Sequence, residues 1–494
     1  MNSSPSYDDL ASWDDLGPGV VETEDPNDIK KVDPRPLPPD IVELDNSIAE
    51  LEAQIAALKL KREQSLSQRA LITRVPAEIL CRIFELGVDG TIDLLPTINL
   101  VSRQWREVAL SDSILWSYIV LDSAWGWRIP SFMRKMHAHL QRSKESKLYI
   151  ELDLHTNDLD DAQTIMTKLK PHLSRCYSLY VFAPDWPRAR TVREYASELG
   201  PALECFYFSI DSSESDLEQP VCILTQPCPL LNYVMLEQAP LQSINIATPA
   251  LRQLDLVRHH LCHSGQRIAY SFKDVVAILV NSRLKWFNMR WGFLNVDTIE
   301  DAFRANPVVH ELPGLRGLVF DVVDSASISL FLDTFSLPGL ESISVHSGDD
   351  IHWITRVALS PRQFPSLRLL DLRNFNLSGA GLAPFIRALY QLPQLTGLGL
   401  AQPSTGIIGA RFFDVLAAAP ETTGEWLLPR LEALCLQSCA DVSGYELLQV
   451  VNARRGAADT QVAKISFLKL SECYLVSSEA FDRLTTLVAT VRLL

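Results

Sequence analysis

Four neighbouring side chains form the group in this sequence that is richest in potential metal ligands. His259, His260, Cys262 and His263 stand together in the segment HHLCH, and imidazole and thiolate groups are the usual ligands of zinc. A metal centre needs a second ligand group at a suitable distance along the chain, and no group with a recognised spacing accompanies this one. We therefore predict no metal site here.

A second group could support acid–base chemistry. His346, Asp349, Asp350 and His352 fall within seven residues, close enough to gather in one loop. Short polar segments of this kind are more often solvated loops than catalytic sites, because a general base needs a pocket and a positioned partner. The spacing predicts a solvated loop.

The cysteines and the remaining motifs give no further support for catalysis. Cys222 and Cys228 are too far apart for a Cys-x-x-Cys motif, and Cys435 and Cys439 are four residues apart. The sequence contains no glycine-rich phosphate loop, no G-x-S-x-G elbow and no H-E-x-x-H motif. We predict a protein that is not an enzyme and needs no cofactor.

Composition restricts the class of protein. The 494 residues are 47% hydrophobic and 21% charged, which is ordinary for a folded chain of several domains or a solenoid. The net charge of −15 argues against a nucleic-acid partner. The longest apolar run, Val275–Val280, is far too short to cross a membrane. Nine scattered cysteines and a polar, acidic start predict an intracellular protein with reduced thiols, in the cytoplasm or the nucleus.

The elements that would position a site begin after an acidic leader. Residues 1–40 hold seven prolines and ten acidic residues against three basic ones, and few apolar side chains. Such a segment cannot offset its ordering entropy, so the composition predicts a disordered tail. It is either a solvated leader without a role or a docking tail.

Residues 41–70 are predicted to form an amphipathic or coiled-coil helix. Isoleucines recur every seven residues and a leucine follows each by three, at Ile41/Leu44, Ile48/Leu51 and Ile55/Leu58. Isoleucine at a and leucine at d favour a parallel two-stranded coil. Two roles remain open: a weak homodimer through residues 41–58, or, slightly favoured, packing of the same stripe within the chain, which avoids the entropy of joining two chains.

Residues 71–121 are predicted to form a small helical unit with surplus apolar surface. In VPAEILCRIFEL, Pro76 suits a first helical turn, and four apolar residues follow at helical spacing. The segment PTINLVSRQWREVAL repeats this pattern, and LWSYIVL ends the block. The apolar positions exceed what so small a core can bury, which indicates a partner surface.

The ordered set VPAEIL-x-x-IF, LVSRQWREVA and LW-S resembles the F-box, and its setting resembles the large F-box-like families of mushroom-forming fungi. The family pattern has leucine where Val75 stands and cysteine where Ser102 stands. The resemblance implies docking on a Skp-family adaptor and through it on a cullin. It also implies that Trp116 packs the unit against the next part of the chain. The adaptor-binding residues that it implies are Pro76, Ile79, Leu80, Ile83, Phe84, Val101 and Trp105.

After a predicted linker at 122–144, residues 145–494 repeat the phrase Pro-x-Leu-x-x-Leu-x-Leu. This is the strand half of a leucine-rich repeat. Spacings between the leading residues run from 20 to 36, so several units carry inserted loops. The strand-like segments at 148–154 and 178–184 are predicted to start the array. The leading residues are Leu203, Leu231, Leu251, Leu284, Leu315, Leu340, Leu367, Leu395, Leu431 and Ile465.

Side chains two apart in a strand share a face, so Leu434 and Leu436 should enter the core while Cys435 faces out. Leu398 is predicted to be core for the same reason. Charged residues between core leucines are then candidates for binding a protein target on the concave face. These candidates are Arg252, Asp255, Arg316, Arg368, Asp371 and Glu432.

The predicted architecture is α/β: a short N-terminal helix, a small all-helical F-box and an irregular leucine-rich-repeat solenoid with parallel strands concave and helices convex. By resemblance, such a chain is a substrate-recognition subunit of an SCF-type ubiquitin ligase. The alternative is a leucine-rich-repeat scaffold that acts outside a ligase.

Overall fold

A computed structural model describes most of the chain. The described residues are 39–69, 75–90, 94–122, 125, 128–211, 222–244, 249–257, 269–291, 293–295, 309–346, 353–354, 357, 364–374, 382–401, 408–418, 425–457 and 462–493. Most of the predicted tail at 1–40, the HHLCH segment and residues 349, 350 and 352 lie outside them. Among the described helices, none has the length and apolar character needed to cross a bilayer.

Two compact units divide the chain, residues 1–76 and 77–494. In the first unit, α1 (Pro39–Arg69) is one continuous helix without an internal proline or glycine. The six isoleucines and leucines of its heptad pattern are between 40% and 66% exposed. The sequence therefore predicted the helix and its apolar stripe, and the homodimer through residues 41–58 stays a prediction.

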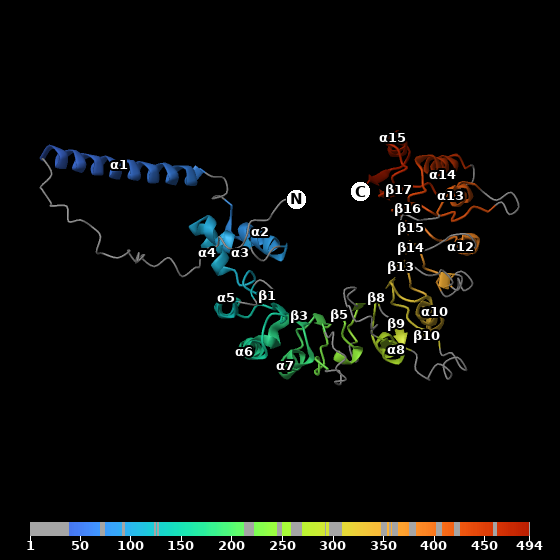
Figure 1. Ribbon diagram of the computed structural model, residues 1–494, viewed down its shortest axis with the longest axis horizontal. Coiled ribbons are helices and arrows are strands. Elements are labelled where there is room, and N and C mark those ends of the chain that lie inside the picture. Colours follow the sequence, from blue (N-terminus) through green and yellow to red (C-terminus); the bar gives the residue numbers. More distant parts are fainter. Residues whose placement is uncertain are drawn as a thin grey trace, which may run out of the picture. The chain divides into compact units, whose positions relative to one another are not determined.

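The second unit begins with three short helices and continues into alternating strands and helices (Figure 1). Its architecture is mixed α/β with a helical N-terminal region, as the sequence predicts. The helices are α2 (Ala77–Gly90), α3 (Leu94–Val101), α4 (Arg103–Ser111), α5 (Ile129–Arg142), α6 (Leu159–Leu169), α7 (Trp186–Ala196), α8 (Phe272–Asn281), α10 (Ser325–Thr334), α12 (Leu382–Tyr390), α13 (Ala410–Ala417), α14 (Gly444–Gly456) and α15 (Ser478–Leu487).

Fourteen strands form one sheet in which every neighbouring pair is parallel. The strands follow chain order across the sheet, which is a solenoid-like arrangement. They are β1 (Tyr118–Leu121), β2 (Leu148–Asp153), β3 (Cys176–Ala183), β4 (Cys205–Ile210), β5 (Tyr233–Glu237), β6 (Gln253–Val257), β8 (Trp286–Arg290), β11 (Gly317–Asp321), β13 (Ser342–His346), β14 (Leu369–Arg373), β15 (Gly397–Ala401), β16 (Ala433–Gln437), β17 (Phe467–Ser471) and β18 (Thr490–Leu493).

Two small parallel pairs lie outside the main sheet. The strand β7 (Ala269–Ser271) pairs with β9 (Phe293–Asn295), and β10 (His310–Glu311) pairs with β12 (Phe335–Ser336).

The Pro-x-Leu phrase produces a turn just before the strand that follows it. In Leu312–Leu315 the amide of the leading Leu315 donates to the carbonyl of Leu312 at 3.3 Å, with Pro313 as the second residue. Proline suits this position because its fixed φ matches the first central residue of a type I or type II turn. The same bond closes at Leu231, Leu340, Leu367, Leu395 and Leu431. Every strand from β4 to β17 in the main sheet begins two residues after its leading residue.

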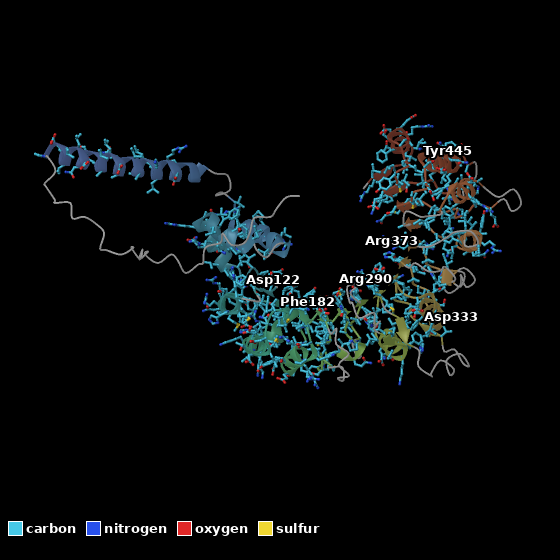
Figure 2. The ribbon with its side chains drawn as sticks, in the orientation of Figure 1. Asp122, Phe182, Arg290, Asp333, Arg373 and Tyr445 are labelled. Atoms are coloured by element: carbon cyan, nitrogen blue, oxygen red, sulfur yellow. The ribbon has the colours of Figure 1, made fainter. Side chains whose placement is uncertain are left out.

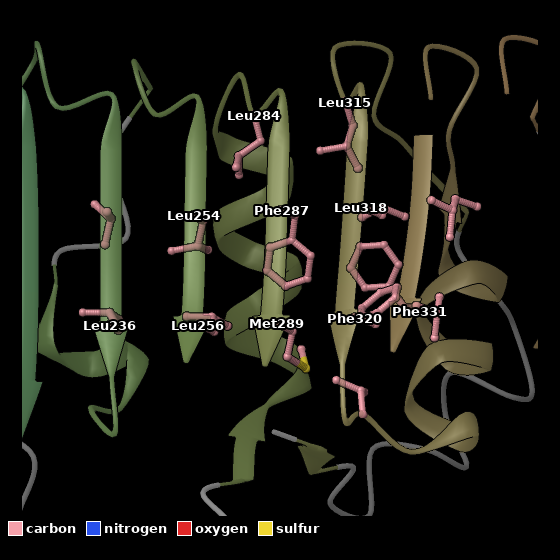
Figure 3. Packing of buried hydrophobic residues seen from close by; sticks show 14 of the residues in the cluster. Leu236, Leu254, Leu256, Leu284, Phe287, Met289, Leu315, Leu318, Phe320 and Phe331 are labelled. Carbon is pink, nitrogen blue, oxygen red and sulfur yellow. The ribbon is translucent and has the colours of Figure 1, made fainter. Parts of the chain in front are cut away.

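Alternate strand positions fill one continuous core. The inward residues of neighbouring strands stand in register, as Phe287, Leu318 and Ile343 do on β8, β11 and β13. All ten leading residues and the inward residues of the strands that follow them, β4 to β17 of the main sheet, are buried, Leu398 among them at 1% exposure. Figure 3 shows two such rows, with Phe331 of α10 packed behind them. The sequence prediction of these core positions is confirmed.

The helices cover one face of the sheet, and the strands alone form the opposite face, which we call the open face (Figure 1). Several of these helices start at a side-chain cap. Asp158 accepts from the Asp161 amide at 2.8 Å, and Ser443 with Glu446 forms a capping box on α14. Such caps satisfy amides that a helix start leaves unpaired, so they fix where these helices begin.

A left-handed residue follows many of the strands. Five non-glycine residues that come directly after a strand have φ between 50° and 58°: Gln238, Trp291, Val322, Asn374 and Ser438. The amide of each donates to the carbonyl of the last residue of the next strand, for example Ser438 to Ser471 at 2.8 Å. Since the bond prolongs the ladder past the strand end, it offsets the cost of the conformation.

The segment 122–144, predicted to be a linker, is part of the folded array. It contains α5, whose Phe132, Met136 and Leu140 lie in the same core as the sheet. The sheet also starts earlier than predicted, because β1 pairs in register with β2. Sequence alone missed this unit because its strand, Tyr-Ile-Val-Leu, is short and lacks the Pro-x-Leu phrase that marks most of the later units.

Candidate binding surfaces

Two apolar stripes run along α2, and they face different surroundings. Leu80, Phe84 and Val88 repeat every four residues and are at most 1% exposed. Ile79 and Ile83 lie one position earlier on the helix and are 53% and 50% exposed. Because adjacent residues are rotated by about 100° around a helix, one stripe fills the unit's own core and the other faces solvent.

The structure corrects part of the predicted adaptor-binding set. Leu80 and Phe84 are buried, and the Phe84 ring lies 4.9 Å from that of the half-buried Trp105 on α4. Leu80 and Phe84 therefore belong to the unit's own core and are not free to contact a partner as a surface would, whereas the adaptor role of Trp105 stays a prediction. Helical spacing alone cannot separate the two stripes, because both are apolar.

Four predicted residues remain at the surface, and two more apolar residues join them. Pro76 is exposed, as are Ile79 and Ile83, and Val101 at the end of α3 is 54% exposed. Sequence reasoning missed Leu86 and Leu100, which are 60% and 64% exposed. The signal for Leu86 was present, since it follows Ile79 by seven residues and so lies on the same side of α2.

Ser102, which stands where the family pattern has cysteine, begins α4. Its hydroxyl accepts from the amide of Trp105 at 3.1 Å, as an N-cap does. A serine at this place fixes the start of the helix that carries Trp105, typically contributing about 1 kcal/mol. The departure from the pattern therefore has a local structural reason.

Trp116 joins the helical unit to the sheet, as the sequence predicts. Its indole N–H donates to the carbonyl of Ala109 on α4 at 2.8 Å, and its ring meets His139 of α5 with centroids 5.1 Å apart. The guanidinium of Arg142 lies 4.2 Å from the same ring. Burial and the neighbouring Lys135 lower the pKa of His139 to about 4, so the imidazole is neutral in this contact at physiological pH.

On the sheet, only two of the six predicted target-binding residues occupy outward strand positions. Asp371 on β14 is partly exposed there. Asp255 on β6 is only 7% exposed and accepts hydrogen bonds from Tyr233, Gln253 and Asn288. Its carboxylate is therefore largely occupied by neighbouring side chains.

The other four candidates lie one residue before a strand. The backbone amides of these residues form part of a hydrogen-bond ladder at the edge where the strands begin. The backbone amide of Arg316, for example, donates to the carbonyl of Lys285 at 2.8 Å; the four residues are Arg252, Arg316, Arg368 and Glu432. Arg316 also pairs with Glu341 at 3.0 Å. Their assignment to outward strand positions was wrong, because the residue after the leading leucine still belongs to the turn.

A polar network occupies the centre of the open face. His346 lies between two carboxylates, with Nδ1 3.6 Å from Asp321 and Nε2 3.7 Å from Asp371. Arg373 contacts Asp371 at 2.9 Å, and the Ser344 hydroxyl donates to it at 3.1 Å. Figure 2 shows Arg373 and Arg290 on the open side of the sheet and Asp333 on the helix side.

Ser344 and His346 are in hydrogen-bond contact at 3.2 Å, which superficially resembles a nucleophile with its base. Burial alone would favour a neutral imidazole, but hydrogen bonds with Asp321 and Asp371 outweigh it and raise the pKa of His346. Since the serine proton points to Asp371, the imidazole is the donor toward Ser344. The serine proton is directed to a carboxylate and not to the imidazole, so this arrangement is a polar network and not a nucleophile with its base. Among the described residues, no group of three or more potential ligands could hold a metal ion.

The network predicts a pH dependence. A histidine whose pKa is raised by folding stabilises the protein fully below its unfolded pKa of about 6.5, and this contribution disappears as pH rises through the folded pKa. We expect wild type to lose up to about 1 kcal/mol relative to His346→Gln as pH rises from 6 through the folded pKa of His346. Thermal melts across this range test it, with the exposed His137→Gln as control. Parallel wild-type and His346→Gln profiles would contradict the ion-pair network.

The small helical unit is continuous with a solenoid-like α/β array, because β1 follows α4 in the chain and pairs with β2. Residues 72–122 match the family model of the F-box-like domain, about a tenth of the chain. No curated protein matches the sequence. Among solved structures, a protein of Bacteroides fragilis aligns at 12% identity and a TM-score of 0.32, over 75% of this chain and 81% of that one.

Proposed function

We propose that this chain is the substrate-recognition subunit of an SCF-type ubiquitin ligase, whose F-box docks a Skp-family adaptor and through it a cullin. The F-box-like match at 72–122 carries the proposal. The two solvent-facing isoleucines of α2 support it, because a stripe that the domain core does not use is available to a partner.

The sheet is, in this proposal, a leucine-rich-repeat domain that binds a protein target. Support comes from the turns that close at six of the Pro-x-Leu phrases, the parallel strands two residues later and the helices on one face. In a repeat array the inward positions are core, so recognition falls to the outward ones. The open face is therefore the proposed target surface.

The proposed mechanism is positioning, and the chain itself performs no covalent chemistry. Holding a target on the adaptor complex raises its effective concentration beside a charged ubiquitin-conjugating enzyme. The sheet begins at β1, within the F-box-like region, and Trp116 packs between α4 and α5. This continuity suits a receptor that must hold its target at a set distance from the adaptor. We place this activity in the cytoplasm or the nucleus.

Replacing both solvent-facing isoleucines by aspartate tests the adaptor surface. We expect Ile79→Asp/Ile83→Asp to weaken adaptor binding at least about 100-fold, because two desolvated charges would cost roughly 3 kcal/mol or more. Co-purification of the tagged full chain with the adaptor measures the effect. The melting temperature should stay close to wild type, since both side chains face solvent.

A matched control introduces the same charges elsewhere. Tyr474→Asp/Leu475→Asp replaces side chains that are 83% and 56% exposed and should leave adaptor binding unchanged. Undiminished adaptor capture by the folded α2 variant would contradict the assignment of this surface. The same co-purification distinguishes the ligase from the alternative function. Recovery of the adaptor together with a cullin supports a ligase subunit, whereas recovery of the adaptor alone supports a scaffold outside a ligase.

A further inference from the structure

The apolar stripe of α1 is exposed along its whole length. Its six side chains are between 40% and 66% exposed and occupy successive a and d positions of a heptad repeat. α1 is one uninterrupted helix (Figure 1), and a helix in water gains most of its stability by packing an apolar face. The stripe is therefore a surface for a partner helix. It consists of Ile41, Leu44, Ile48, Leu51, Ile55 and Leu58.

Acidic and basic side chains are separated along α1. Residues 40–52 contain five acidic residues and no lysine or arginine, whereas residues 59–62 contain three basic residues and no acid. All of them are exposed. Within the part of the chain that the structure describes, none of these charged groups forms an ion pair. One end of the helix is negative, the other end is positive, and both charges are available to a partner.

We propose that α1 pairs with α1 of a second copy of this chain in an antiparallel two-stranded coil. Charge complementarity selects this occupant, because the acidic end of one helix then lies beside the basic end of the other. A two-fold axis relates the two helices, so the same surface is used on both, as in most homodimers. In a parallel pair, each charged end would lie beside its own like charge.

The apolar stripe is self-complementary in the antiparallel direction. In such a pair, the a positions of one helix pack beside the d positions of the other, so every isoleucine of the stripe meets a leucine. The two-fold axis generates each contact twice. The preference of isoleucine at a and leucine at d for two strands applies to parallel coils and does not exclude this direction. The facing residues are Ile41 and Leu58, Leu44 and Ile55, and Ile48 and Leu51.

The positions that flank the stripe, e and g, distinguish the two directions. In an antiparallel pair e faces e and g faces g, which brings Lys59 to Asp45 and Lys61 to Asp40. Counted over both chains, four opposite-charge contacts stand against one like-charge contact, between the two copies of Glu52. In a parallel pair each g position faces the e position five residues later, so Asp40 meets Asp45 and neither lysine meets an acid. The charges therefore favour the antiparallel direction.

This direction determines where the two chains leave the coil. α1 ends at Arg69. In the register of the facing pairs, the two copies of this residue lie at opposite ends of the coil, roughly 60 Å apart at a rise of about 1.5 Å per residue. A parallel coil would release both chains at the same end. The antiparallel coil therefore separates the starts of the two F-box-like regions.

Sedimentation velocity of the full chain at concentrations up to about 100 μM tests the proposal, since a dissociation constant of that size would still be visible. We expect a dimer whose population rises with concentration. Lys59→Glu/Lys61→Glu converts all four opposite-charge contacts into like-charge contacts, so it should weaken dimerisation at least about tenfold. In a parallel pair neither lysine faces a carboxylate, so the same change would have little effect.

A charge swap tests the direction of the helices. Adding Asp40→Lys and Asp45→Lys to the lysine variant restores the four opposite-charge contacts. The dissociation constant should then return to within about threefold of the wild-type value. Arg283→Glu/Lys285→Glu is the matched control, because it makes the same change of net charge at the same spacing on exposed side chains outside α1. It should leave dimerisation unchanged.

Replacing the centre of the stripe tests the apolar contact. Ile48→Asp/Leu51→Asp should give a monomer at every concentration, because the two charges would be desolvated in the coil. Four results would overturn the proposal: a wild-type monomer throughout, a dimer that survives the aspartates, no effect of the lysine variant, or no recovery by the charge swap. The adaptor is absent from these measurements, so their outcome is independent of the ligase proposal.

Discussion

Leu398→Asp is expected to abolish the cooperative unfolding of the array. Leu398 is 1% exposed and stands in register between Leu370 of β14 and Leu434 of β16. Truncating a buried leucine typically costs about 2–5 kcal/mol, and burying a carboxylate adds to this. The total approaches the whole stability of a typical domain, about 5–15 kcal/mol. Since each repeat depends on its neighbours, the damage should spread beyond β15.

The neighbouring leucine on the opposite side of the sheet provides the control. Leu369 is 49% exposed on the open face and pairs in register with Gly397. Leu369→Asp should cost less than about 1 kcal/mol. Circular dichroism and thermal melts on the two variants measure the difference. If both melt as wild type does, the inward assignment of Leu398 is wrong.

Arg454→Ala is expected to destabilise the C-terminal repeats by about 3–5 kcal/mol. Arg454 on α14 is 1% exposed, and burial lowers its pKa to about 10, so it remains charged at neutral pH. Its guanidinium donates to the carbonyls of Leu427 at 2.6 Å, Leu428 at 3.1 Å and Leu416 at 3.4 Å. Removing it leaves three buried carbonyls without this donor and opens a cavity.

The adjacent arginine tests whether burial, and not charge, is responsible. Arg455 is exposed and donates to the carbonyl of Leu487, so Arg455→Ala should cost less than about 1 kcal/mol. Arg454→Lys should fall between the two, because a single ammonium cannot reproduce the planar fork of donors. Urea unfolding midpoints measure all three. Equal effects of the two alanine variants would contradict the role of Arg454 as a buried clamp.

Residue spacing along the chain was enough to predict the local elements. Proline followed by leucine at the third position predicts a turn, and the alternating leucines after it predict a strand with one buried face. Both hold at Leu315 and Leu431, where the turn bond forms and the strand starts two residues later. The same reasoning identified Leu398 as core and α1 as an amphipathic helix.

The packing of the elements determines which apolar and charged side chains are available to a partner. On α2, Leu80 and Ile79 have the same chemistry, and only the packing of α2 in its unit buries the first and leaves the second exposed. Arg316 could not be distinguished by sequence from an outward strand residue, because its role depends on where the turn ends.

The packing of the helical unit against the sheet also could not be predicted from the sequence. The segment containing α5 has no Pro-x-Leu phrase. Its apolar residues are identified as core only because β1 and Trp116 pack against the helix. The row of outward tyrosines from Tyr118 on β1 to Tyr207 on β4 likewise arises only when these strands align in register. Local spacing of apolar residues determines the type of each element. Contacts between distant residues depend on how the elements stack, and this stacking decides which side chains are exposed to a partner.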